Sequence, residues 1–324
     1  MMRRFAFVSG YLVAQAAYAG PPELVLPLDC TLGQTCYIED YVDSDPGPGQ
    51  RDFTCGLKSR DGHRGTDIVL QSFEAIKDGV RVLAAAPGRV AAMRDGMVDR
   101  AITAGTMETI KNRECGNAVR IDHGDGWQTM YCHMRQGSVA VRQGDIVAAG
   151  TALGLVGLSG LTNIPHVHLT VLKDGETVDP FAPAPANACG APQEDTLWQD
   201  DPPQYHEAGL FTAGFSSAVP SFEEVQSGAA RAPEIEADAP LVLHGHVFYA
   251  ETGDVLEFSA TGPEGEVLSH REILRDPQLQ LFRAFGRKAP AGGWPTGAYR
   301  GYVRLLRGDA LIAWRHADTM IISR

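Results

Sequence analysis

Glycine and proline occur so often in this chain that long helices have little room to form. The 324 residues include 36 glycines and 20 prolines. Short runs of alternating apolar and polar residues between Gly and Pro turns are typical of β-strands. At roughly 150 residues per domain, the length favours two domains. The sequence therefore predicts a mostly β protein in two parts.

The first nineteen residues predict the compartment. Arg3 and Arg4 precede a largely apolar stretch, and Ala17-Tyr18-Ala19 fits the small-x-small rule for cleavage. This pattern indicates a secretory signal peptide, residues 1–19. The apolar stretch falls short of the roughly 20 residues that cross a bilayer, so we expect no membrane span. The mature protein is then exported, to the periplasm or to the extracellular space.

Six cysteines follow this leader, at positions 30, 36, 55, 115, 132 and 189. An even number of cysteines in an exported chain indicates disulfide bonds. The segments 117–123 and 127–133 form a predicted hairpin that brings Cys115 and Cys132 to neighbouring rungs, so we expect these two to be bonded. The other four cysteines allow three pairings, and the sequence does not choose among them.

The organisation along the chain follows from turns and composition. Residues 20–58 are expected to be irregular, and residues 59–181 to form an antiparallel β-sheet domain. The Pro- and Ala-rich residues 182–204 are interpreted as a linker, and residues 205–324 as a C-terminal β-sandwich domain. The predicted strands of the first domain are 80–86, 89–93, 117–123, 127–133, 138–141, 146–148, 152–156 and 166–172. Those of the second are 241–249, 255–260, 298–306 and 310–315.

Three aspartates near the start, Asp43, Asp45 and Asp52, suggest calcium at first sight. Their spacing matches no EF-hand loop, so they are interpreted as turn residues. The acidic balance of the whole chain has a clearer meaning. A formal net charge of −12 argues against a nucleic-acid partner, which needs a basic face.

Four histidines and one aspartate lie in three short clusters. These are His63-Arg-Gly-Thr-Asp67, Tyr131-Cys-His133 and His166-Val-His168. Side chains alternate along a strand, so His166 and His168 point the same way, and His133 shares a face with Tyr131. An even offset can likewise place His63 and Asp67 on one side. The three clusters are therefore predicted to converge on one groove.

Two imidazoles and one carboxylate are a normal protein ligand set for catalytic zinc, which keeps one position open. The two remaining histidines would then lie beside that position, where they could transfer a proton or stabilise an oxyanion. For a single histidine, a structural role in a sheet is the better explanation. Three separate clusters together favour the metal.

The three clusters resemble the lysostaphin-type (LytM-type) zinc endopeptidases that cut peptidoglycan peptides, whose signatures are H-x-x-x-D and H-x-H with another histidine between. The resemblance covers about residues 60–181 and includes the flanking runs 116–124, 141–150, 154–157 and 178–180. It implies a barrel-sandwich-hybrid type of β fold. It also implies that His63, Asp67 and His168 bind one Zn²⁺ per chain, and that His133 and His166 are the catalytic pair.

The resemblance predicts an exported zinc metalloendopeptidase whose substrate is a peptide of peptidoglycan cross-links or stem peptides. The alternative is an inactive peptidase-like domain that binds cell wall or activates a partner hydrolase. Such proteins typically lose metal ligands, whereas all five positions are present here. Two departures, Asn163-Ile164 for Thr-Gly and Thr170 for Glu, concern specificity. The C-terminal domain is a candidate surface for substrate or a partner, and its His244-Gly-His246 is interpreted as structural.

Overall fold

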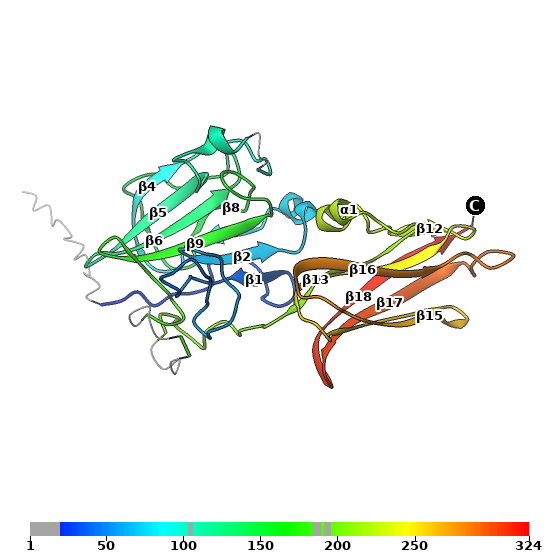
Figure 1. Ribbon diagram of the computed structural model, residues 1–324. Helices are drawn as coiled ribbons and strands as arrows, with labels where there is room; N and C mark the ends of the chain where they lie inside the picture. Colours follow the sequence, from blue (N-terminus) through cyan, green and yellow to red (C-terminus); the bar gives the residue numbers. More distant parts are fainter. Residues whose placement is uncertain (1–19, 103–105, 184–188, 191–195, 324) are drawn as a thin grey trace, which may run out of the picture.

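The computed structural model describes residues 20–102, 106–183, 189–190 and 196–323. The predicted signal peptide, residues 1–19, and part of the predicted linker lie outside the described residues. Within the described ranges, no helix has both the length and the apolar character needed to cross a membrane. Two β-rich halves follow one another along the chain (Figure 1), and the prediction of a mostly β protein is confirmed.

The first half is built on an eight-stranded sheet in the order β1-β2-β9-β6-β5-β4-β7, with β10 paired to β9. All these pairs are antiparallel. The strands are β1 (Cys36–Asp40), β2 (Thr66–Leu70), β4 (Gly88–Arg94), β5 (Asn117–Gly124), β6 (Trp127–Met134), β7 (Ile146–Val147), β9 (His166–Lys173) and β10 (Glu176–Val178). The separate pair β3 (Arg81–Leu83) and β8 (Ala152–Leu155) and two 3₁₀ helices, η1 (Phe73–Asp78) and η2 (Met107–Ile110), complete this half.

One face of the large sheet is the hydrophobic core of the first half. Val119, Tyr131, Val167 and Leu169 are completely buried there. Burying an aliphatic or aromatic side chain of this size stabilises a fold by roughly 1.5–3 kcal/mol. Because side chains alternate, the neighbours of these residues point to the opposite face of the sheet. That opposite face carries His166 and His168.

The first strand corrects the expectation that residues 20–58 are irregular. β1 is the edge strand of the large sheet and pairs with β2, and Leu24 forms an isolated bridge with Trp198. All five residues of β1 are buried, including Glu39 and Asp40. The strand lacks polar and apolar alternation, and for that reason its sequence does not indicate a strand.

Other predicted strands of this half are confirmed in place but differ in length. The predicted strand 138–141 is wrong: after β6 the chain turns, and Ala140 donates one backbone hydrogen bond to Leu153 without forming a strand. The strands β2 and β10 were not predicted. Both are short, so neither offers a long stretch of alternation.

The second half has two sheets around one core. A three-stranded sheet, β11-β13-β16, faces a five-stranded sheet, β12-β18-β17-β14-β15. Their strands are β11 (Gly209–Ser216), β12 (Glu234–Glu236), β13 (Leu241–Ala250), β14 (Val255–Gly262), β15 (Gly265–Ile273), β16 (Gln278–Arg287), β17 (Gly297–Arg307) and β18 (Ala310–Ile322). The helix α1 (Phe222–Ser227) lies where the two halves meet (Figure 1). The four predicted strands appear as β13, β14, β17 and β18.

Three disulfides connect the six cysteines. Cys115–Cys132 confirms the predicted pair, and the others are Cys30–Cys36 and Cys55–Cys189. Cys189 belongs to the predicted linker, so the last bond ties that segment to the loop around Cys55.

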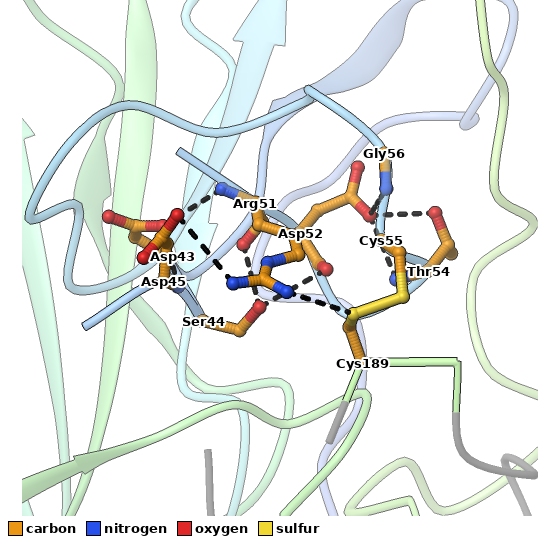
Figure 2. The surroundings of a disulfide bond; sticks show 9 residues. All are labelled: Asp43, Ser44, Asp45, Arg51, Asp52, Thr54, Cys55, Gly56 and Cys189. Atoms are coloured by element: carbon orange, nitrogen blue, oxygen red, sulfur yellow. Dashed lines mark hydrogen bonds and ion pairs between the residues drawn. A yellow bond between two sulfur atoms is a disulfide. The ribbon is translucent and has the colours of Figure 1, made fainter. Parts of the chain in front are cut away.

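The three aspartates near the start of the chain lie in the loop beside the Cys55–Cys189 bond (Figure 2). The Asp52 carboxylate accepts hydrogen bonds from the backbone N–H of Thr54, Gly56 and Lys58. Asp43 accepts from the N–H groups of residues 45, 51 and 62. These carboxylates organise the loop, which agrees with their interpretation as turn residues.

Candidate metal centre

Three of the predicted site residues converge from a loop and two neighbouring strands. His63 lies in the loop before β2, Asp67 is in β2, and His168 is in β9 directly opposite Asp67 in the strand register. Cross-strand partners point to the same face of a sheet. Their donor atoms lie within 4.8 Å of one another. The structure thus brings His63, Asp67 and His168 together.

Gly65 makes this convergence sterically feasible. A Cβ atom at this position would lie 2.6 Å from the His168 imidazole and 2.7 Å from the Leu169 carbonyl oxygen. Such distances are too short for any side chain. The glycine between His63 and Asp67 therefore leaves the space that the His168 ring occupies.

The geometry of the three donors suits a tetrahedral metal. Ligand atoms about 2.0–2.1 Å from a tetrahedral zinc lie roughly 3.3 Å apart. His63 Nε2 is 3.2 Å from His168 Nδ1 and 3.2 Å from Asp67 Oδ2, and His168 Nδ1 is 2.7 Å from Asp67 Oδ1. Small movements would accommodate an ion between them, so two imidazole nitrogens and a carboxylate fit a zinc ion.

The second nitrogen of each ring shows which atom is available to a metal. His63 Nδ1 lies 2.7 Å from the Tyr41 carbonyl oxygen, and a carbonyl can only accept. His63 Nδ1 therefore carries the proton, and Nε2 keeps its lone pair for a ligand. His168 Nε2 lies 3.0 Å from the Thr170 hydroxyl, which leaves Nδ1 facing Asp67. Metal-binding histidines are usually held in this way by their second nitrogen.

His133 and His166, the predicted catalytic pair, lie beside this cluster. Their ring centroids are 4.6 Å apart, and His166 Nε2 is 3.6 Å from Asp67 Oδ1. His133 Nδ1 donates to the Ser159 carbonyl and His166 Nδ1 to the Ile164 carbonyl, at 2.8 and 2.9 Å. Both rings thus retain a lone pair on Nε2. All five predicted side chains are in one place.

His133 reaches the site by a route that strand alternation does not predict. Tyr131, expected on the same face, points into the core, and Cys132 is the cross-strand partner of His168. His133 adopts a left-handed backbone conformation with φ of 62°. This break in the strand turns its side chain toward His166. The expectation of a face shared with Tyr131 is therefore wrong, and the left-handed residue is the reason.

Burial and neighbouring charges set the protonation of the site. Burial and the neighbouring imidazoles hold the pKa of His133 well below its ordinary value, and burial lowers the pKa of His166 despite the Asp67 carboxylate. Burial alone would raise the pKa of Asp67, but the three adjacent imidazoles outweigh it and hold that pKa well below the usual range. The pair His133 and His166 is therefore neutral at pH 7 and can accept protons, whereas Asp67 is ionised.

Sequence reasoning missed two residues that contact the metal-binding set. The Thr170 hydroxyl contacts His168, and Thr170 was noted only as a departure from the family pattern. Arg60 forms an ion pair with Asp67, 2.5 Å between Nη2 and Oδ2. No motif contains Arg60. Its position three residues before His63 is the only signal that could have drawn attention to it.

Comparison with known proteins agrees with this geometry. Residues 61–180 match the description "Peptidase family M23". This part of the chain is a peptidase family M23 domain. The five site residues all lie inside the matched range.

Curated relatives share a stretch of this M23 domain. One is 38% identical over 78 residues to the DD-carboxypeptidase/endopeptidase Mpg of Neisseria meningitidis, a stretch that covers 24% of this chain and 17% of the relative. Another is 39% identical over 71 residues to the cell division protein DipM of Caulobacter vibrioides, covering 20% and 11%. The chain thus spans less than a fifth of the length of these relatives.

Solved structures also align with the M23 domain. The catalytic domain of the M23 protein EnpA from Enterococcus faecalis is 25% identical, with a TM-score of 0.31, and the alignment covers 49% of this chain and 94% of that one. For the catalytic domain of lysostaphin from Staphylococcus simulans, the identity is 21%, the TM-score 0.29 and the coverage 44% and 85%.

Proposed function

We propose that this protein is an exported zinc metalloendopeptidase that hydrolyses peptide bonds of peptidoglycan cross-links or stem peptides. The observation that carries the proposal is the convergence of His63, Asp67 and His168 beside His133 and His166, within an M23 domain. The names of the relatives, a DD-carboxypeptidase/endopeptidase and a cell division protein, support a cell-wall substrate. The predicted leader and three disulfides support export.

In this proposal, His63, Asp67 and His168 hold one zinc ion. When bound, zinc supplies Lewis-acid polarisation of a carbonyl oxygen and makes water easier to ionise. His133 and His166 have neutral rings, each fixed by a backbone carbonyl at Nδ1, so either Nε2 can accept a proton from an attacking water. The same atom, once protonated, can donate to the leaving amine or to an oxyanion.

Substrate needs access to the site. A cavity of about 460 Å³ borders His63 and is lined on other sides by Asp43, Arg64, Glu176 and Thr177. We propose that this cavity accepts part of a stem or cross-link peptide. We also retain residues 59–181 as the peptidase domain, to which β1 of the preceding segment contributes an edge strand, residues 182–204 as the linker, and residues 205–324 as the C-terminal domain.

Digestion of purified sacculi tests the proposal. The full mature chain is incubated with sacculi with and without a chelator, and the released muropeptides are identified. We expect zinc-dependent release of peptides that differ from their parents by one hydrolysed amide. Binding of sacculi without release would support the inactive, wall-binding alternative instead.

A further inference from the structure

The proposed metal ligand Asp67 is held by a chain of polar contacts that starts at Arg60. One nitrogen of the Arg60 guanidinium lies 2.5 Å from Asp67 Oδ2, and the other lies 2.6 Å from Asp40 Oδ2. Asp40 is the cross-strand partner of Asp67 between β1 and β2. The two carboxylates are almost completely buried, with side-chain exposures of 4% and 2%. Arg60 therefore joins two buried carboxylates that face each other across the strand pair.

The second half of the chain continues this contact network. The Tyr249 hydroxyl donates a hydrogen bond to Asp40 Oδ1, and Gln280 Nε2 donates to Glu39 Oε1 at 2.5 Å. Tyr249 lies in β13, and Gln280 lies in the adjacent β16, where it is the register partner of Phe248. Two neighbouring strands of the C-terminal domain thus hold two consecutive carboxylates of β1.

Tyr249 occupies an unusual backbone position. It has a φ of 50°, and the strand register passes from Phe248 to Ala250 without pairing it. A left-handed conformation at a residue other than glycine is uncommon and costly. Strain of this kind persists only where the surroundings impose it. Here the left-handed residue directs its phenol toward Asp40.

The rest of the interface fixes the two halves together around this network. Tyr37 and Val69 of the first half form an apolar cluster with Phe211 and Phe248 of the second half. The buried Lys58 ammonium donates to the carbonyls of Ile38 and His206, each at 2.8 Å. The interface therefore holds the residues of β1 that precede Asp40 and leaves Tyr249 little freedom to move away.

We propose that the C-terminal domain positions the metal ligand: Tyr249 orients Asp40, Asp40 orients Arg60, and Arg60 holds one oxygen of Asp67 so that the carboxylate meets the metal in a fixed orientation. Tyr249, Asp40 and Arg60 are positioning residues. A carboxylate has about four acceptor sites on its two oxygens, so Asp67 can bind Arg60 and a metal together. Outer-shell partners of this kind tune metal affinity. The inference rests on the proposed zinc site.

Zinc affinity of the full mature chain, measured by competition with a chromophoric chelator, tests this inference. Arg60→Lys keeps the positive charge but loses the planar fork that spans two carboxylates. We expect Arg60→Lys to weaken zinc binding by about tenfold. Tyr249→Phe should weaken it by roughly threefold, because Tyr249 acts on Asp67 only through Asp40 and Arg60. Tyr205→Phe is the matched control. Its hydroxyl donates to Asp52 at 2.8 Å near the same interface. Among the described residues, Asp52 forms no hydrogen bond or ion pair with Arg60 or Asp67.

A combined variant separates this mechanism from a general loosening of the fold. If Tyr249 acts through Arg60, adding Tyr249→Phe to Arg60→Lys changes the affinity no further. Thermal unfolding with chelator present establishes that each variant is folded, and the comparison of the two Tyr→Phe variants stands even where Arg60→Lys does not fold. Equal zinc affinity in Tyr249→Phe and Tyr205→Phe, with wild-type binding intact, overturns this inference alone. A wild-type chain that binds no zinc overturns the proposed function as well.

Discussion

Two strands of this molecule carry the same short pattern, a histidine on either side of one residue. β9 has His166 and His168, and β13 has His244 and His246. In both strands alternation places the two rings on one face. All four side chains are wholly or largely buried. The pattern by itself therefore does not distinguish the two places.

Their surroundings differ. Around β9, Asp67 and His63 approach His168, and a backbone carbonyl fixes Nδ1 of His166. Around β13, His246 lies between aromatic rings, 4.8 Å from Phe211 and 5.5 Å from Phe222 between ring centroids. Within the described residues, the only converging group of three His, Cys, Asp or Glu side chains is His63, Asp67 and His168. A second strand and a loop, each supplying a donor, distinguish a candidate metal centre from two packed histidines.

Replacing the second histidine of each pattern by phenylalanine tests this comparison most strongly. His168→Phe keeps an aromatic ring but removes a proposed ligand, and zinc affinity should fall by about 100-fold or more, with loss of peptide hydrolysis. His246→Phe should leave both zinc affinity and hydrolysis as in the wild type. Chelator competition and muropeptide release give the two measurements. The comparison fails if both variants bind zinc equally well.

Within β9, substitutions of the two histidines should have different effects on zinc binding and on hydrolysis. His166→Gln removes a proposed proton acceptor but none of the three proposed ligands. We expect about a 100-fold lower kcat, in line with general acid–base contributions, and one zinc per chain as in the wild type. Metal analysis of the purified variant and steady-state hydrolysis of a cross-linked muropeptide separate the effects. Loss of zinc in His166→Gln would mean that the ligand is the first histidine rather than the second.

Much of this site could be predicted from the sequence, because its residues lie in short local patterns. The offset from His166 to His168 and the glycine between His63 and Asp67 are properties of a few consecutive residues. The position of His133 was predicted for the wrong reason. Its left-handed backbone conformation depends on how β6 ends, and no local sequence pattern predicts it.

The contacts between the halves could not be predicted. β1 is buried at every position and shows no alternation of polar and apolar residues. In the sequence, its Glu39 and Asp40 resemble loop residues. Only the folded structure shows that they accept hydrogen bonds from Gln280 and Tyr249. Such contacts join residues more than 200 positions apart in the chain. Local propensity and periodicity contain no information about pairings of that range. For the same reason the sequence predicts a boundary between two domains but not the contacts between them.

Acid should destabilise the fold through the two buried histidines of β13. Burial lowers the pKa of His244 and of His246 to about 4 in the folded protein, against an ordinary value of 6.5. Unfolded chains therefore bind these protons first, so the stabilisation is complete above pH 6.5 and is lost as the pH falls toward 4. Each histidine should contribute about 2 kcal/mol of lost stability between pH 7 and 5, at about 1.4 kcal/mol per pKa unit.

His246→Phe provides the control for this pH dependence. Denaturant unfolding at several pH values, with chelator present throughout, should show a shallower loss of stability in the variant than in the wild type. Between pH 7 and 5 the variant should lose about 2 kcal/mol less stability than the wild type, the amount expected for one histidine. An identical slope in both proteins would mean that His246 already carries its proton in the fold or that water reaches it.

The glycines that face the two histidine pairs offer the last and smallest test. A Cβ added at Gly65 would lie 2.6 Å from the His168 ring, and a Cβ added at Gly214 would lie 2.7 Å from the His244 ring. Overpacking of this kind costs about 1–3 kcal/mol of stability, so both Gly65→Ala and Gly214→Ala should unfold at lower temperature. Only Gly65→Ala moves a proposed ligand, and only this variant should weaken zinc binding, by about tenfold. If instead both variants bind zinc as the wild type does, the His168 ring tolerates displacement, and the proposed site depends less on the space at Gly65 than its geometry indicates.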